Sequence, residues 1–568
     1  MHLHNNKNIS NNKRVLFIYS VVVLFFFACG NKESPAPPPV LVKNPVFTTA
    51  TVNDISLENL VYDVNLQPAV KISFTEPLKQ SSVAAAVTVA DMNGVAVTVN
   101  TSLQNDDKTI LIQPAAALGY LKKYAVRVST SLQSSSGGRL QSEVSKNFVT
   151  RIDSSRKFPL LTDNALLDLV QQQTFKYFWD FGHPVSGLAR ERNTSGDIVT
   201  SGGSGFGIMT IPVAINRNFI TRAQGLARMQ TIVTFLKNTA VKVKGAFPHW
   251  LNGSTGAIVP FSANDNGADL VETSYLMMGL LTARQYFNGV DAAETTLRTD
   301  INTLYNNVEW DWFRQGTQNV LYWHYSPDRG WVMNLPIRGW NECLITYVLA
   351  AASTTHGIPA AVYTNGWAAN GSTNGFINGN TYYTHQLPLG TAFGGPLFFA
   401  HYSFMGINPN GLTDAYANYE VQTRNHSLIN YKHSIANPRS WYGYSDSVWG
   451  LTASDISGGY TASSPTNDIG VIAPTAAISS IPYTPTESLK ALKFFYYVLG
   501  DKLWKEYGFV DAFSLKDQWF ASSFLAIDQG PMVVMIENYR TGLLWNLFTS
   551  CPEVKAGMLS LGFSAPYL

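Results

Sequence analysis

Charged side chains are scarce in this chain of 568 residues: only 14% are Asp, Glu, Lys or Arg. The two signs nearly cancel, with 40 basic against 38 acidic residues and a formal net charge of +2. This leaves no basic field that would attract nucleic acid and no acidic tail, so we expect no nucleic-acid partner. The sequence also has no nucleophile elbow, phosphate-binding loop, dinucleotide fingerprint or HExxH motif, so we predict no cofactor and no metal.

Cysteine is almost absent as well, with three residues at positions 29, 343 and 551. That number excludes a small scaffold held together by disulfides. Cys343 and Cys551 can pair only if the fold brings them together, and we expect two free buried thiols.

The N-terminus has the pattern of a targeting segment. Lys7, Lys13 and Arg14 precede an apolar run at 15–28, which is too short for a comfortable membrane span. The run ends at Cys29 and resembles a bacterial lipoprotein signal over 1–29, in which Cys29 is the lipidated residue. A proline-rich tether follows at 30–45. We therefore expect a lipid-anchored protein of the periplasm or outer membrane.

Residues 46–152 are predicted to form a small all-β domain. Short β-branched runs at 70–74, 109–112 and 124–128 are separated by turn signals such as Asn93-Gly94, at a spacing typical of a β-sandwich. The segment resembles the bacterial Ig-like modules found on secreted glycosidases. It holds no cluster of catalytic residue types, so we interpret it as a spacer rather than a binding module.

Helical periodicity dominates from residue 156 to 568. Capping patterns at Thr162, Thr221 and Thr484 open apolar stretches, and further helices are predicted at 205–216, 268–287, 339–355, 394–405 and 531–548, among others. Roughly a dozen helices with little strand-like alternation favour an all-α catalytic domain folded as an (α/α)6 toroid. A helical solenoid is the rival, but no fixed repeat period is present. Long loops at 182–205, 364–395 and 445–468 are expected to wall a cleft.

Two groups of carboxylates lie at the starts of apolar helices. Glu342 follows Trp340 and precedes an apolar helix, a partly dehydrated setting that would raise its pKa as a general acid requires. Asp265, Asp269 and Glu272 precede another helix, where one can act as a base and the others can hold sugar hydroxyls. Paired carboxylates beside tryptophan are what hydrolysis of a glycosidic bond requires. We therefore predict Glu342, Glu272 and Asp269 as catalytic. Each also has a structural alternative, as a helix cap or a solvated acid.

Further residues are candidates for substrate contacts because aromatic rings stack on sugars and charged groups bind hydroxyls. His401 follows an apolar run, where a histidine is more often a core group. With Asp265, the predicted contacts are Arg190, Arg192, Trp250, Trp340, His401, Tyr402, Trp441, Tyr442, Trp449 and Asp455.

Five ordered blocks carry a family resemblance over about 160–565: GAFPHW at 245–250, VETSYL at 271–276, GWNE at 339–342, WGLTASD at 449–455 and IAPTAA at 472–477. Together they resemble the glucoamylase-like domain of bacterial endo-β-1,2-glucanases, glycoside hydrolase family 144. The resemblance implies an (α/α)6 fold, endo-acting hydrolysis of linear β-1,2-glucan to sophorooligosaccharides, and inversion at the anomeric carbon.

Three alternatives stay open. The domain can release sophorose in exo fashion, act as a β-1,2-glucan transglycosylase, or serve as a surface glycan-binding lipoprotein without catalysis. In each case we expect a monomer whose partner is a β-1,2-glucan chain, with the membrane reached only through the lipid anchor.

Overall fold

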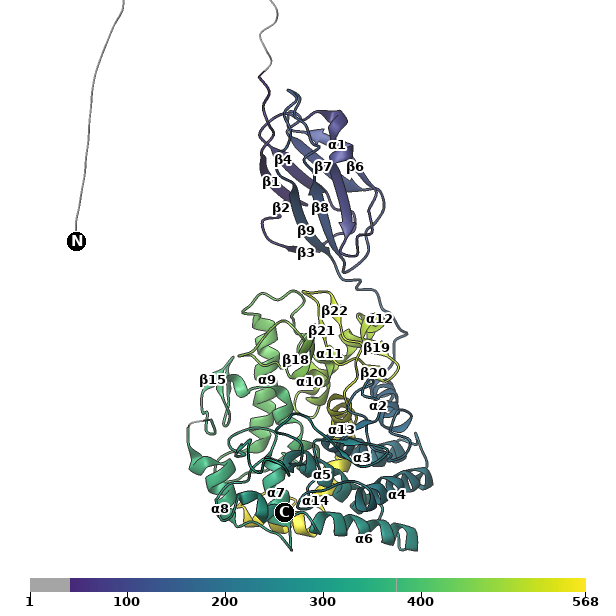
Figure 1. Ribbon diagram of the computed structural model, residues 1–568, viewed down its shortest axis with the longest axis vertical. Coiled ribbons are helices and arrows are strands. Elements are labelled where there is room, and N and C mark those ends of the chain that lie inside the picture. Colours follow the sequence, from purple (N-terminus) through teal and green to yellow (C-terminus); the bar gives the residue numbers. More distant parts are fainter. Residues whose placement is uncertain (1–40, 374) are drawn as a thin grey trace, which may run out of the picture.

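The computed structural model describes residues 41–373 and 375–568, which form a β-domain followed by a larger helical domain (Figure 1). The predicted signal over 1–29, Cys29 and most of the tether lie outside the described residues. No helix in the part that is described is both long enough and apolar enough to cross a membrane.

The β-domain is a sandwich of two sheets, as the alternating runs predict. One sheet has the order β2-β1-β4-β7-β6 and the other β3-β9-β8-β5. Their inward side chains, including Ile72, Ile110 and Val126, are buried in one separate apolar core. The strands are β1 (Phe47–Val52), β2 (Ile55–Ser56), β3 (Val61–Val64), β4 (Val70–Phe74), β5 (Val87–Asp91), β6 (Val99–Gln104), β7 (Thr109–Pro114), β8 (Lys123–Val128) and β9 (Val144–Thr150), with α1 (Gln80–Ala86) between β4 and β5.

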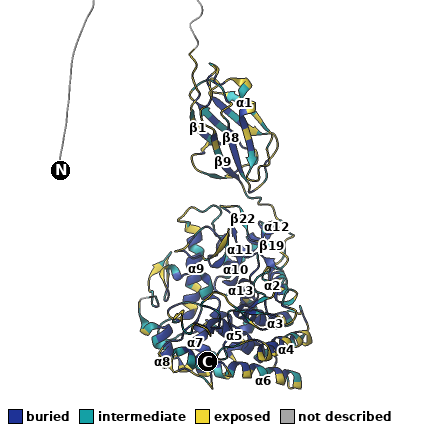
Figure 2. Ribbon diagram, viewed as in Figure 1, coloured by how far each residue is buried: buried dark blue, intermediate teal, exposed yellow. Residues whose placement is uncertain are grey.

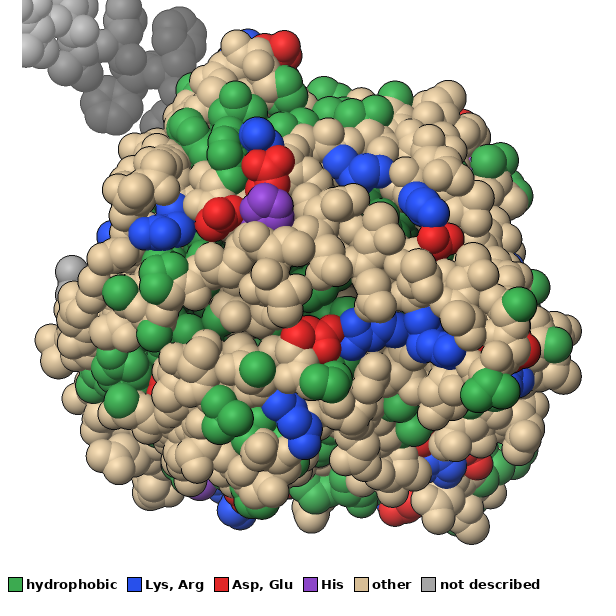
Figure 3. All heavy atoms as spheres, turned by 90° about the horizontal axis from the view of Figure 1, so that it is seen from below, with side chains coloured by type: hydrophobic (Ala, Val, Ile, Leu, Met, Phe, Trp, Pro, Cys, Tyr) green, Lys and Arg blue, Asp and Glu red, His purple; other side chains and the backbone are tan. Residues whose placement is uncertain are grey.

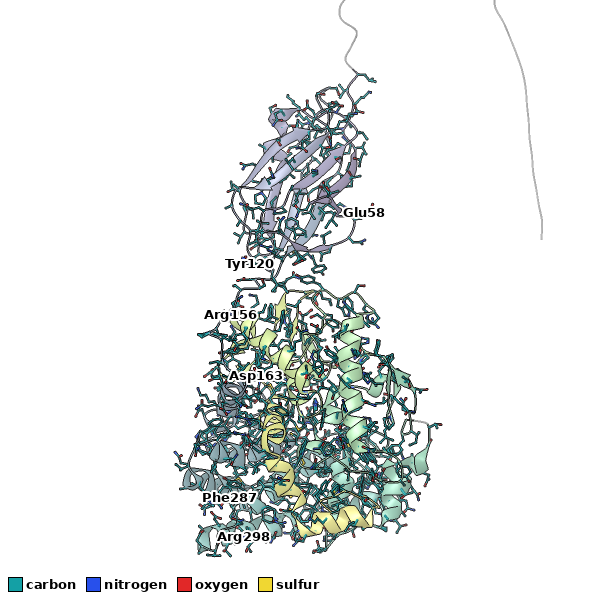
Figure 4. All side chains as sticks on the ribbon, turned by 180° about the vertical axis from the view of Figure 1, so that it is seen from behind. Glu58, Tyr120, Arg156, Asp163, Phe287 and Arg298 are labelled. Atoms are coloured by element: carbon teal, nitrogen blue, oxygen red, sulfur yellow. The ribbon has the colours of Figure 1, made fainter. Side chains whose placement is uncertain are left out.

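The sandwich rests on the helical domain through its lower end. Tyr62 of β3 stacks on Tyr442 with ring centroids 4.6 Å apart, and its hydroxyl donates to the Lys516 carbonyl. Leu121 and Val149 of the sandwich belong to an apolar cluster of the helical domain. Figure 4 labels Tyr120 at this lower end and Arg156 at the top of the helical domain. The two domains therefore pack against each other through apolar side chains, whereas a flexible spacer would make no such contact.

Helices build the second domain in an inner and an outer layer. The inner helices α3, α5, α7 and α13 are buried along most of their length, whereas α4 and α6 expose one face (Figure 2). The principal helices are α2 (Asp163–Trp179), α3 (Ser201–Asn216), α4 (Arg222–Asn238), α5 (Leu270–Tyr286), α6 (Ala292–Asn306), α7 (Leu344–Ala352), α9 (Tyr419–Ala436), α10 (Pro474–Ser479), α11 (Pro485–Tyr497), α13 (Ala526–Thr541), α14 (Leu543–Thr549) and α15 (Pro552–Ser560).

Glycine lets the two central helices approach backbone to backbone. A Cβ on Gly205 of α3 would lie 2.1 Å from the Tyr275 carbonyl oxygen, and one on Gly279 of α5 would lie 2.2 Å from the Gly205 oxygen. Any side chain here would force α3 and α5 apart. This close packing fixes the start of α3 against the middle of α5, and the starts of both helices carry residues of the candidate site.

Three sequence predictions need correction or confirmation here. The predicted helix at 394–405 is a series of short 3-10 turns, because Phe393, Gly394 and Gly395 all have positive φ. The capping box at Thr221 is confirmed, but the Thr484 side chain makes no cap hydrogen bond and donates to the Ser480 carbonyl instead. Cys343 and Cys551 are both free and buried, as expected.

Short β-pairings occur within the three predicted long loops and also elsewhere in the helical domain. These are β10 (Ile198–Thr200), β11 (Trp250–Asn252) and β12 (Ile258–Val259), then β13 (Ala268–Asp269) with β14 (His324–Tyr325), β15 (Thr381–Tyr382) with β16 (His385–Gln386), β17 (Ala453–Ile456) with β18 (Gly459–Ala462), β19 (Trp504–Lys505) with β20 (Gly508–Phe509), and β21 (Phe513–Ser514) with β22 (Trp519–Phe520).

The end view of the molecule in Figure 3 shows charged side chains in small mixed groups, with no continuous patch of one sign. On this face, the mixed charges reflect the near balance of 40 basic and 38 acidic residues in the sequence.

Candidate active site

A cavity of about 350 Å³ opens where several inner helices begin. That volume lies within the roughly 300–1,000 Å³ range of small-molecule sites. Its wall combines three carboxylates, one arginine, one histidine and many aromatic rings. The lining residues are Glu191, Arg192, Thr200, His249, Trp250, Phe261, Glu272, Tyr275, Trp323, Glu342, Phe398, Tyr402, Ala453, Tyr460, Leu525 and Ile527.

Glu342 stands in the cavity wall two residues before α7. Its carboxyl group makes no hydrogen bond or ion pair to any other described residue, so it is available to a ligand in the cavity. Burial, with smaller contributions from the charges of Asp269 and Glu272, raises its pKa from 4.5 to about 7. A carboxyl that is protonated near neutral pH and faces a cavity has the properties of a general acid.

Glu272 lies in the first turn of α5 and joins two helix starts. Its Oε2 accepts hydrogen bonds from the Gly202 backbone N–H at 2.7 Å and from the Thr200 hydroxyl at 3.2 Å. Burial raises its pKa, although His249 opposes this. Glu272 therefore lines the cavity and also locks the start of α3 onto α5.

Asp269 is fully buried beneath the cavity and does not line it. Its Oδ1 accepts from the Val271 and Glu272 backbone N–H groups, which caps α5, and its Oδ2 lies 3.1 Å from His249 Nδ1. Pairing of β13 with β14 places His324 opposite Asp269, with Nε2 3.5 Å from Oδ2. The sequence predicted that Asp269 is catalytic, but its buried carboxylate does not reach the cavity. It instead holds the start of α5, His249 and His324 in place.

The charges around Asp269 shift one another. Burial lowers the pKa of His249, but Glu272, Asp269 and Asp265 outweigh it and raise the value to about 9. The two histidines hold the pKa of Asp269 below its ordinary value despite its burial, whereas burial and Asp269 raise that of Asp265 to about 6. At neutral pH His249 is therefore an imidazolium at the cavity wall.

Among the described residues, one cluster has donors at a spacing that a cation can use. Atoms of His249, Asp265 and Asp269 all lie within 4.8 Å of one another. His249 already places a positive charge beside these acids, because its raised pKa keeps it protonated and it donates a hydrogen bond to Asp269.

We expect exhaustive treatment with EDTA to leave the turnover rate unchanged within about twofold, because His249 and His324 neutralise the carboxylates without a metal. The measurement is activity before and after chelation, followed by metal analysis of the protein. A loss of activity that one divalent cation restores would overturn the prediction of a metal-free site.

Arg192 organises a second acidic group. Its Nε lies 2.9 Å from Glu191 Oε2 and its Nη1 lies 3.1 Å from Asp455 Oδ2. Burial lowers the pKa of Arg192, but Glu191 and Asp455 raise it above the ordinary value. The Asp455 backbone N–H donates to the Asp511 carboxyl. Asp511 and Asp528 are both buried, and their side chains interact. Burial raises the pKa of Asp511 to about 6 and holds that of Asp528 well above its ordinary value.

Five of the predicted site residues thus meet in the cavity wall: Arg192, Trp250, Glu272, Glu342 and Tyr402. Asp265 and Asp269 lie behind His249, and Asp455 lines a neighbouring groove through its pairing with Arg192.

Other predicted contacts are corrected by burial or by existing partners. Trp340, Trp449 and His401 are 3%, 0% and 2% exposed, so they are core residues that no sugar reaches in this conformation. Arg190 is engaged by the Phe181 and Gly196 carbonyls. Trp441 packs under Lys516 and Tyr442 stacks on Tyr62, which places both near the junction with the sandwich.

Sequence reasoning did not single out His249, His324, Tyr460, Asp511 or Asp528. His249 falls inside the GAFPHW block, so that block was the available signal. The others are isolated along the chain. Only the tertiary fold brings Tyr460 to the cavity wall, His324 to Asp269, and Asp511 with Asp528 to the group around Asp455.

Comparison with known proteins finds relatives of both domains. A family model described as "Putative glucoamylase" matches residues 334–552, and one described as "Bacterial Ig-like domain" matches 47–150. A solved "putative glucoamylase" from Bacteroides uniformis is 54% identical with a TM-score of 0.71, and an endo-β-1,2-glucanase from Chitinophaga pinensis, solved with sophorotriose and glucose, is 50% identical with a TM-score of 0.70. Each match covers 72% of this chain and 100% of the other.

A curated relative from Parabacteroides distasonis is 46% identical over 425 residues, 71% of this chain. It is an exo β-1,2-glucooligosaccharide sophorohydrolase acting at the non-reducing end, and the match spans 58% of its length. The chain belongs to the glucoamylase-like family of glycoside hydrolases, family 144, with a bacterial Ig-like module ahead of its catalytic domain.

Proposed function

We propose that this protein is an endo-acting hydrolase of linear β-1,2-glucan that yields sophorooligosaccharides with inversion at the anomeric carbon. The observation that carries the proposal is Glu342, an unpaired carboxyl in the cavity with a pKa of about 7. The names of the relatives from C. pinensis and P. distasonis support a β-1,2-linked substrate.

In the proposed mechanism, Glu342 gives its proton to the glycosidic oxygen as the bond to the anomeric carbon breaks, directly or through a sugar hydroxyl. A water attacks that carbon from the other face and loses a proton to a carboxylate. We assign this base function to the group of acids organised by Arg192, of which Glu191 lines the cavity. Inversion would require a separation of roughly 6.5–9.5 Å between the acid and the base. His249 places fixed positive charge beside the site.

An exo-acting, sophorose-releasing enzyme is the second candidate, because the P. distasonis relative has that activity. The two modes differ in how polymer length changes with time. Endo cleavage shortens the polymer before much disaccharide appears, whereas exo cleavage releases sophorose from the first turnover.

The deciding experiment incubates residues 46–568 with linear β-1,2-glucan and follows reducing ends and product sizes together. A rapid fall in polymer size with sophorooligosaccharides supports endo hydrolysis. Steady sophorose release supports the exo mode, and recyclised chains without new reducing ends indicate a transglycosylase. Binding without any product indicates a glycan-binding protein and sinks the proposal.

The pH dependence should follow the proton on Glu342. With a folded-state pKa of about 7, the acid is protonated below that value and loses its proton above it. We therefore expect kcat/KM to fall about tenfold for each pH unit above about 7.5. The measurement is a pH–rate profile of the free enzyme, and a profile that stays flat to pH 9 would contradict this role.

We further propose that the helical layers close into an (α/α)6 toroid. Buried inner helices surrounded by amphipathic ones support the toroid.

We also propose that the chain is a monomeric lipoprotein anchored through Cys29. Replacing Cys29 with alanine in the full chain should move the protein from the membrane fraction to the soluble fraction; continued membrane association would contradict the anchor.

A further inference from the structure

A second hollow adjoins the candidate active site. It has a volume of about 580 Å³ and is more open than the catalytic cavity. Arg192 and Tyr460 line both, so the two hollows share a wall. We call this second hollow the side groove, and its walls are the 192–194 loop, the β17–β18 hairpin, and the segment from β22 to Ser523.

Tyr460 stands at the boundary between the two hollows. It pairs with Asp455 across the β17–β18 hairpin, and its residue is 46% exposed. At the hairpin turn, a Cβ on Gly458 would meet nothing within 4 Å, so this tip is not packed against the rest of the domain. A half-exposed residue in the shared wall, beside an unpacked hairpin tip, can face a ligand that lies along both hollows.

Trp519 provides a second ring in the groove. It is partly exposed, and within the described residues its side chain makes no ring stack, no hydrogen bond and no cation–π contact. Its neighbour Phe520 behaves differently, because it stacks parallel to Phe513 and packs on the apolar cluster. A large ring without a partner beside polar groups such as Asn193 and Ser523 is typical of a surface that takes an amphipathic ligand.

The Ig-like module contacts the hairpin that forms one wall of the groove. The turn between β21 and β22 contains Lys516, whose carbonyl accepts the Tyr62 hydroxyl from the sandwich at 3.1 Å. The strand that leaves this turn carries Trp519, which pairs with Ser514. The module therefore fixes the hairpin that presents the ring.

We propose that the side groove binds distal glucose units of the same glucan chain whose scissile bond lies in the catalytic cavity, with Trp519 and Tyr460 as stacking surfaces. Because the two hollows share Arg192 and Tyr460, we assign the ligand of the side groove to the same glucan chain that the cavity binds. The inference rests on the proposed function and deepens it, because it assigns the groove to recognition of chain length.

The test compares wild type, Trp519→Ala and Tyr460→Ala on β-1,2-glucooligosaccharides of increasing length and on the polymer. The matched control is Tyr539→Ala, since Tyr539 is an exposed aromatic residue that lines neither hollow. For Trp519→Ala we expect KM on long chains to rise about tenfold with kcat little changed, as loss of one stacked ring implies. The effect should shrink as the substrate becomes too short to leave the cavity, and Tyr539→Ala should match wild type throughout.

Circular dichroism checks that each variant folds, and Trp519→Leu serves if Trp519→Ala does not, because leucine removes the ring but keeps more of the side-chain volume. Wild-type turnover together with an effect of the Trp519 substitution that is equal at every length, or with no effect, overturns the side-groove inference alone. No wild-type turnover on any length overturns the proposed function and, with it, this inference.

Discussion

Replacement of Glu342 by glutamine is expected to lower kcat/KM on β-1,2-glucan by about 10²–10⁴-fold, the usual contribution of a general acid. Glutamine keeps the size of the side chain and removes its proton-donating carboxyl. Affinity for the glucan should remain, because the cavity wall is otherwise unchanged. The measurement combines initial rates with binding of the inactive variant to the same polymer.

The stability of the same variant provides an independent check on the raised pKa. A carboxyl whose pKa rises from 4.5 to about 7 on folding binds more protons in the folded state, so it lowers stability as pH increases across that interval. Glu342→Gln removes this penalty and should melt at or above the wild-type temperature at pH 8, with a smaller difference at pH 5. Wild-type rates in the variant would remove Glu342 from the mechanism, whatever its melting behaviour.

Replacement of Asp269 by asparagine is expected to destabilise the folded protein by about 3–5 kcal/mol, as removal of one partner from a buried ion pair does. Asp269 caps α5 with one carboxylate oxygen and faces His249 and His324 with the other. Asparagine can retain the cap but removes the fully buried negative charge that faces both imidazoles, which leaves Asp265 as the one acid near both of them among the described residues. The measurement is the denaturation midpoint at pH 7.

Asp265→Asn is the matched control, because Asp265 lies against the same two histidines but has its pKa raised to about 6. Its ionised form is already disfavoured, so the substitution should cost little at pH 5 and become neutral or stabilising as pH rises past 6. Asp269 has a lowered pKa, so its contribution is present above about pH 4 and is lost as pH falls further. Equal losses for the two variants at pH 7 would contradict this division of charge.

The sandwich and the individual helices were predictable because local patterns determine them. Alternating or β-branched runs marked β4, β7 and β8, and Thr221 with Gln224 marked the start of α4 through a capping box that the structure confirms. Where glycines with positive φ interrupt the backbone, as around 394–395, the apolar pattern alone wrongly predicted a helix. The place of Glu342 at a dehydrated helix start was also predictable, since Trp340 and the apolar helix are its sequence neighbours.

Assignments that depend on residues far apart in the chain were not predictable in the same way. Trp340 and Trp449 are of a residue type that often stacks on sugars, but the helical layers bury them. Burial of a large aromatic side chain removes much apolar surface from water and so stabilises the fold. Asp511 and Asp528 have no motif around them, yet folding places them beside the Arg192 network.

The sequence by itself determined the two-domain order, the family and the carboxyl that we propose as proton donor, because short-range patterns and motif blocks encode all three. Only the tertiary structure decided that Asp269 supports the site from beneath, that Glu191 and Arg192 reach the cavity, and that the Ig-like module braces a groove beside it. The physical reason is that burial and charge pairing between distant segments set which groups meet a ligand, and neither exists until α3, α5 and the loops pack together.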